Sequence, residues 1–195
     1  MFETLAFLYG RKMKQNGMYY ITDEFKQLVR NLGGEWNDKK KRPVVCLIES
    51  SEYPNLYWAI PVGKVNHRDE QAMLRIKDYM AKPSRDLRSC YYHLGRTTNK
   101  SIFFISDAIP ITDKYILEEH LGSDNNPYII KNPILLNTLQ NKLNRVLSFE
   151  VSNRNYFRQH ITDIKNYLIA ELEAEKANVS KAEAAVTQEE NQENN

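Results

Sequence analysis

Four side chains that can bind a phosphate or move a proton lie within five residues, directly after an apolar segment. Lys64, Asn66, His67 and Arg68 follow residues 57–62, which have the composition of a buried strand. Lysine and arginine can stabilise negative charge on a phosphate, and histidine has a pKa close to neutrality. The pattern predicts a basic site at the end of a strand, although ordinary solvated residues at a strand end would have the same composition.

A second basic stretch precedes the neighbouring apolar run. Four consecutive cations come directly before a proline, namely Lys39, Lys40, Lys41 and Arg42. Residues 44–48 then form a short apolar run typical of a central strand. We expect this run to pair with residues 56–62 as a hairpin, and antiparallel pairing would bring Arg42 and Lys64 to the same end of the sheet.

Metal-free cleavage of RNA needs chemistry that these residues can supply. A base removes the proton of the ribose 2′-hydroxyl, an acid protonates the leaving oxygen, and cations stabilise the charge that develops on phosphorus. Lys64 and Arg42 are the candidates for holding the phosphate, and His67 is the candidate for proton transfer. We expect the other cations, together with Asn66, Ser51 and Thr98, to contact the RNA.

Other catalytic and metal-binding classes fit the sequence less well. Residues 66–69 include the His-Arg-Asp of a kinase catalytic loop, but the chain has no Gly-rich phosphate loop and is too short for a kinase. Cys90 and His93 have a spacing that a metal could use, yet the remaining histidines are scattered, so we expect neither a metal site nor a cofactor. Cys46 lies among apolar residues, which indicates a buried, reduced thiol.

Length and charge indicate one folded unit with a basic body. The chain has 195 residues and a formal charge of +2, and residues 175–195 hold five glutamates against two lysines, which leaves +5 on residues 1–174. We interpret residues 1–17 as an N-terminal extension, 18–174 as a single domain and 175–195 as a disordered acidic tail. With no leader-like segment and no apolar run approaching the roughly 18 residues of a membrane span, we expect a cytoplasmic protein without a membrane partner.

The order of apolar patterns predicts an α+β fold. We expect strands near residues 19–22, 44–48, 56–62, 89–94, 101–106 and 128–130, and helices at 23–32, 69–80, near 115–117, at 133–149 and from about 156. These elements would form a small, strongly twisted antiparallel sheet or partial barrel, with added helices and a C-terminal helical pair.

Several segments, taken in order, resemble the ToxN/AbiQ-like toxins of type III toxin–antitoxin systems. The resemblance is carried by Tyr-Tyr-Ile at residues 19–21, the basic residue and proline before the apolar run 44–48, and Tyr-Trp-Ala-Ile-Pro-Val-Gly-Lys at 57–64. A strand leading into a Pro-Ile-Thr turn, residues 102–116, is also similar. Together these segments span about residues 18–170.

The resemblance implies a sheet like that of the MazF/Kid toxins and a metal-independent endoribonuclease that leaves cyclic phosphate ends. It also implies a role in phage defence and a small repeated RNA antitoxin, folded as a pseudoknot and held in a closed protein–RNA assembly. Lys64 matches the catalytic lysine of the family, and Arg42 stands near the place of a second basic residue.

The chain departs from the family pattern at Val62 and Gly63, where a hydroxyl is expected. Three residues of neighbouring loops could supply the hydroxyl, namely Ser50, Ser51 and Thr98; alternatively, Asn66 and His67 could take over its function. A toxin-like endoribonuclease is therefore our first hypothesis. The alternatives are a non-catalytic RNA-binding barrel or regulator, and an interaction module whose C-terminal helices bind protein.

Overall fold

Strand β3 (Tyr57–Lys64) is the centre of the fold because it pairs with three other strands. Its first part pairs with β2 (Val44–Glu49) along one edge and with β6 (Ile109–Ile111) along the other. Its last three residues pair with β5 (Lys100–Phe104). The basic segment that follows β3 therefore begins where the sheet passes from β6 to β5.

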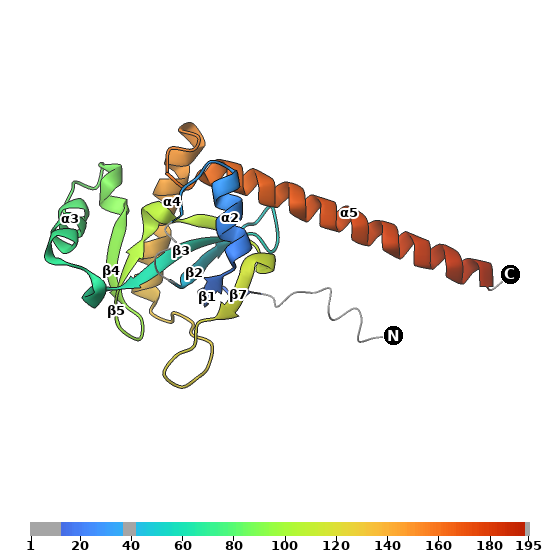
Figure 1. Cartoon of the computed structure of the whole chain (residues 1–195), viewed down its shortest axis with the longest axis horizontal. Helices are drawn as coiled ribbons and strands as arrows, with labels where there is room; N and C mark the ends of the chain where they lie inside the picture. The colour runs from blue at the N-terminus through green and yellow to red at the C-terminus, as the bar shows by residue number, and fades with distance from the viewer. Residues whose placement is uncertain (1–12, 37–41, 194–195) are drawn as a thin grey trace.

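The protein is described by a computed structural model, which covers residues 13–36 and 42–193, with the backbone alone over 182–193. Its sheet has seven strands in the order β4-β5-β3-β2-β1-β7, with β6 attached to β3, and every pairing is antiparallel. The remaining strands are β1 (Met18–Ile21), β4 (Tyr92–Arg96) and β7 (Ile116–Glu119). The expected α+β class and antiparallel sheet are confirmed, and the described sheet is not closed into a barrel (Figure 1).

Helices cover both faces of the sheet. Helix α2 (Asp23–Asn31) and the start of α5 (Ile161–Glu193) pack on one face, and α4 (Pro133–Ser152) packs on the other. Alternate residues of β2 point into these two cores, which explains why β2 reads as a continuous apolar run. Helix α3 (Glu70–Met80) packs beside β4 and β5 in a third, smaller cluster.

Sequence signals for helix starts correspond to real caps. The Thr22 hydroxyl accepts from the amide of Phe25 at the start of α2, and the Asp69 carboxylate does the same for Ala72 at the start of α3. Helix α4 begins with Asn132 as its cap and a proline at its first position, as expected. None of the described helices is long and apolar enough to cross a membrane.

The segment after Thr112 corrects a predicted helix. Asp113–Tyr115 forms a single 3-10 turn, and the following residues form β7, which pairs with β1. A short apolar run has no decisive periodicity, and the open edge of β1 supplies hydrogen bonds that favour a strand. Two other boundaries also move: residues 87–90 are a 3-10 turn before β4, and residues 128–130 contribute only an isolated bridge from Ile129 to Gly17.

Residues 13–17 belong to the folded body, which corrects the predicted extension over residues 1–17. The buried Met13 carbonyl accepts from the Tyr57 hydroxyl at 3.0 Å, and the Asn16 amide donates to the Cys46 carbonyl at 2.7 Å. These contacts join the segment to β2 and β3, so the folded unit begins before Met18. Residues 1–12 lie outside the described part.

Helix α5 continues past residue 174, where the sequence indicated a disordered tail. Its buried side chains end at Leu172, and the described side chains from Glu173 to Lys181 are all exposed. In Figure 1 this part of α5 projects away from the body. Alanine, glutamate and lysine have high helix propensities, which favours a helix without a core contact.

Candidate functional site

A groove of about 520 Å³ opens beside the end of β3. It brings together five of the predicted site residues: Arg42, Lys64, His67, Arg68 and Thr98. The amide of Val62 donates to the carbonyl of Pro43 at 2.8 Å, which holds the Arg42 segment against the end of β3. The expected proximity of Arg42 and Lys64 is therefore confirmed.

Two guanidinium groups lie on one aromatic ring in this groove. The Cζ atoms of Arg42 and Arg68 are 5.1 and 5.0 Å from the ring centroid of Phe104, in contacts of the cation–π type. Phe104 is the last residue of β5 and is almost fully buried. The ring thus holds two like charges together at the wall of the groove.

No ion pair with a described residue neutralises the charges of this arginine pair. The carboxylate of Asp107 interacts electrostatically with both arginines, but it forms its ion pair with Arg158, at 2.8 Å. The Nε atom of Arg68 is buried without a hydrogen-bond partner in the described part of the chain. Burial, followed by repulsion from Arg68, lowers the pKa of Arg42, so an anion bound here would relieve an electrostatic cost.

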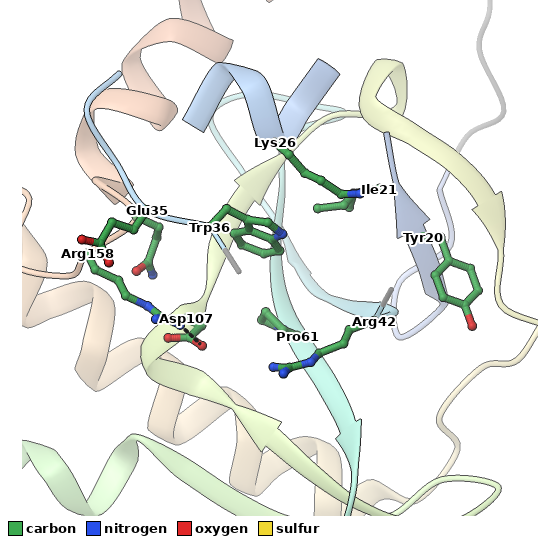
Figure 2. A pocket seen from close by; sticks show the side chains of 10 residues that line it. Tyr20, Ile21, Lys26, Glu35, Trp36, Arg42, Pro61, Asp107 and Arg158 are labelled. Atoms are coloured by element: carbon green, nitrogen blue, oxygen red, sulfur yellow. Dashed lines mark hydrogen bonds and ion pairs between the residues drawn. The ribbon is translucent and has the colours of Figure 1, made fainter. Parts of the chain in front are cut away.

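A second, smaller cavity lies on the other side of Arg42 (Figure 2). Its volume is about 30 Å³, enough for water but not for a nucleotide. It is lined by Trp36, Asp107 and Gln159 among others, and the Gln159 Oε1 atom is buried without a protein partner. Burial raises the pKa of Asp107, against the opposing effect of Arg158. Arg42 lines both this cavity and the groove, and this cavity is too small to be a substrate pocket.

Lys64 faces a neighbouring strand that carries hydroxyl groups. Its partner in the β3–β5 pairing is Ser101, whose Oγ lies 2.8 Å from the Oγ1 of Thr97. Ser101 and Thr97 belong to the β4–β5 hairpin, whereas Lys64 on β3 is mostly exposed. All three residues line the groove. Hydroxyl groups thus lie near the end of β3 on Ser101 of the adjacent strand and on Thr97 of the β4–β5 turn.

Gly63 explains why the hydroxyl is not on β3 itself. A Cβ atom at this position would lie 3.0 Å from Cε2 of Phe104 and 3.5 Å from Nη2 of Arg68. A side chain here would press on the ring that holds the arginine pair. The glycine is therefore consistent with the cation–π arrangement, which takes the space that a serine would need.

A histidine that the sequence did not single out also lines the groove. The Nδ1 atom of His120 lies 3.0 Å from the Tyr20 hydroxyl, and the two rings meet edge to face with their centroids 5.6 Å apart. Burial, and next the charge of Lys64, lower the pKa of His120. His67 also lines the groove, but its side chain is exposed.

Two residues that were predicted to contact RNA, Ser51 and Asn66, do not line the groove. Ser51 is in the β2–β3 turn, next to the pairing of Glu49 with Tyr57, which is the opposite end of β3 from Lys64. Neither Ser50 nor Ser51 therefore lies near the position where the resemblance expects the hydroxyl, and the RNA contact predicted for Ser51 lies outside the groove. Asn66 is exposed on a 3-10 turn and does not line the groove.

The lysine run, Lys39, Lys40 and Lys41, lies outside the described residues. Both cysteines are free and buried, and burial strongly raises the pKa of the Cys46 thiol. Within the described residues no group of three or more His, Cys, Asp or Glu side chains is arranged to hold a metal ion.

The groove residues that sequence reasoning missed are His120, Tyr20, Thr97 and Ser101. Tyr20 and His120 are separated by 100 positions in the chain, and only the pairing of β1 with β7 brings them together. No local sequence motif predicts such a pair. Comparison of the sequence with protein-family models and with curated proteins gives no match.

Proposed function

We propose that the protein is an endoribonuclease toxin of the type III kind, which binds RNA in the groove at the end of β3. The observation that carries the proposal is the pair of guanidiniums on Phe104, without an ion-pair partner among the described residues, beside Lys64. An RNA phosphate supplies the charge that this arrangement lacks. The order of sequence segments that resemble ToxN/AbiQ-like toxins supports the same function.

Cleavage proceeds by attack of a ribose 2′-hydroxyl on the adjacent phosphorus. The O2′–P bond forms as the bond from phosphorus to the 5′-oxygen breaks, leaving a 2′,3′-cyclic phosphate and a 5′-hydroxyl. Lys64, Arg42 and Arg68 stabilise the negative charge of the pentacoordinate transition state. A histidine of the groove, His67 or His120, accepts the proton of the 2′-hydroxyl.

The partner implied by this function is a small repeated RNA that acts as the antitoxin. It would occupy the same basic groove as the substrate, in a closed protein–RNA assembly, and the protein would act in the cytoplasm as part of phage defence. The strongly twisted sheet around β3 would correspond to the partial barrel of MazF/Kid-like toxins, with α3, α4 and α5 as additions.

Lys64→Ala gives the direct test of the activity. We expect the parent protein to cleave single-stranded RNA in buffer containing EDTA and to leave cyclic phosphate ends, and the variant to lose about 10²-fold or more of the rate because the phosphate loses its cation. Cleavage is measured on denaturing gels, with end groups identified by mass spectrometry. Lys176→Ala, an exposed lysine on the projecting part of α5, is the control and should cleave like the parent.

A parent protein that leaves RNA intact, and whose induction leaves a bacterial host growing normally, would contradict the enzyme. Tight binding of a repeat RNA without cleavage would instead support the non-catalytic RNA-binding alternative. Weak binding that is insensitive to salt would favour the interaction module, because phosphate contacts weaken steeply as salt rises.

A further inference from the structure

We propose that His120, oriented by Tyr20, is the catalytic residue that accepts the proton of the 2′-hydroxyl, and that His67 is dispensable for the chemistry. The inference rests on the proposed ribonuclease function and assigns a role that no local motif indicates. It follows from how the two groove histidines are held, which differs sharply between them.

The His120 imidazole is fixed by contacts on several sides. Its backbone amide donates to the Met18 carbonyl, and its carbonyl accepts from the Tyr128 amide, each at 2.8 Å. The Tyr20 hydroxyl contacts Nδ1 at 3.0 Å, and the Tyr128 ring meets the imidazole edge to face with centroids 6.3 Å apart. With Nδ1 engaged, Nε2 has no partner among the described residues and is the nitrogen left for a substrate.

His67 lacks this support. It is the last residue of a 3-10 turn, its side chain is exposed, and it makes no hydrogen bond or ring contact with the described residues. A general base must be held within hydrogen-bond reach of the proton that it removes, and an unrestrained side chain loses this advantage. The arrangement of base and orienting group is present only at His120.

Lys64 connects His120 to the phosphate site. Both side chains line the same groove, and the lysine charge, after burial, lowers the pKa of the imidazole. Tyr20 on β1, Tyr128 and the neighbouring carboxylate of Glu119 on β7 are the other titratable groups close to this ring in space or sequence. The uncharged imidazole that results at neutral pH is the form that can accept a proton.

The proposed step balances with water as the only further reactant. With the Nδ1 proton donated to the Tyr20 oxygen, Nε2 takes the proton of the 2′-hydroxyl while O2′ forms its bond to phosphorus. The bond from phosphorus to the 5′-oxygen breaks, and that oxygen takes a proton from water. Lys64 stabilises the phosphate oxygens throughout, and Tyr20 is a positioning residue that holds the tautomer.

Three variants test the assignment: His120→Gln, His67→Gln and Tyr20→Phe. We expect His120→Gln to lower the cleavage rate by about 10²-fold to 10⁴-fold, the usual contribution of a general base, and His67→Gln to lower the rate far less than His120→Gln does. RNA binding, measured by fluorescence anisotropy, and thermal unfolding should be unchanged in His120→Gln, which separates lost chemistry from lost folding. Tyr20→Phe keeps the ring and should lower the rate less, with a shifted pH–rate profile.

An NMR titration provides a readout that does not depend on cleavage. Removing the lysine charge in Lys64→Gln should raise the pKa of His120, because the Lys64 charge lowers it in the parent. Full activity in His120→Gln, or loss of activity confined to His67→Gln, would overturn the inference while the ribonuclease function stood. An inactive parent protein would instead refute the proposed function itself.

Discussion

At the scale of single residues, the most informative feature is a pair of like charges kept together. Arg42 and Arg68 share the ring of Phe104, and the Nε of Arg68 is buried without a partner. Such an arrangement costs free energy in the unliganded protein, since charges are repelled and a donor is desolvated. A site that binds an anion recovers this cost on binding, which accounts for the arrangement better than packing alone does.

Replacing one of these arginines should change the salt dependence of RNA binding. For Arg68→Gln we expect the slope of log Kd against log salt to fall by about 0.7, the contribution of one phosphate contact on single-stranded nucleic acid. The slope is measured by anisotropy over a range of potassium chloride concentrations. Arg85→Gln removes an exposed arginine that does not line the groove, and its slope should match that of the parent. Equal slopes for both variants would show that Arg68 does not contact phosphate.

The chemistry of the site was predictable from the sequence only where it is local. Lys64 and Arg42 flank two apolar runs whose hairpin pairing follows from composition, and the structure brings them to one groove. His120 was not predictable, because its role depends on Tyr20, which lies on a strand 100 positions earlier. The position predicted for Ser51 relative to Lys64 was also wrong. A residue that is near β3 in sequence can lie beside either end of the strand, and Ser51 lies beside its start.

At the scale of elements, β3 positions the site by changing its partners along its length. Pairing with β2 and β6 occupies both edges of its first part, and pairing with β5 carries its end to the β4–β5 hairpin. The hairpin delivers Ser101 and Thr97 opposite Lys64. The strand-like runs at β2, β3 and β5 were evident from the sequence, whereas β7 was mistaken for a helix because pairing with β1, and not local pattern, decides its conformation.

The connection between α4 and α5 depends on one buried carboxylate, that of Glu150. Its Oε1 accepts from the Asn155 amide at 2.7 Å, the Thr162 hydroxyl at 2.7 Å and the Thr162 amide at 3.3 Å. Because these donors are left unsatisfied in Glu150→Ala, we expect the free energy of unfolding to fall by about 3 kcal/mol, with a smaller loss for Glu150→Gln, which keeps an acceptor oxygen. Urea denaturation measures both changes.

The matched control for this connection is Glu173→Ala, which removes an exposed glutamate from α5. Its free energy of unfolding should stay within about 0.5 kcal/mol of the parent, as is usual for a surface substitution. A similar small effect for Glu150→Ala would show that the connection is held by the apolar contacts of α4 and α5 alone.

At the scale of the whole molecule, charge is divided between a basic body and an acidic helical end. Residues 175–195 carry five glutamates and two lysines, and the described backbone of this segment continues α5 away from the body (Figure 1). Buried contacts of α5 end at Leu172, so the projecting part adds negative charge without adding core. Under the proposed function, we expect its charge to oppose the approach of RNA to the body, since like charges reduce electrostatic steering.

Removal of residues 175–195 tests this division. The shortened chain should unfold at the same temperature as the parent, because the side chains described over residues 175–181 are all exposed. RNA binding at low salt should become about twofold to fivefold tighter, because the formal charge rises from +2 to +5. Both quantities are measurable by calorimetry and anisotropy, and the gain in affinity should shrink as added salt screens the charges.

A full-length variant with all five tail glutamates changed to glutamine separates charge from length. If the acidic end acts through its charge, this variant should bind RNA as tightly as the shortened chain, and the salt dependence of the two should coincide. Tighter binding only in the shortened chain would instead show that the projecting helix blocks access sterically. A marked fall in unfolding temperature on shortening would mean that the segment packs against the body, in conflict with the exposure of residues 173–181.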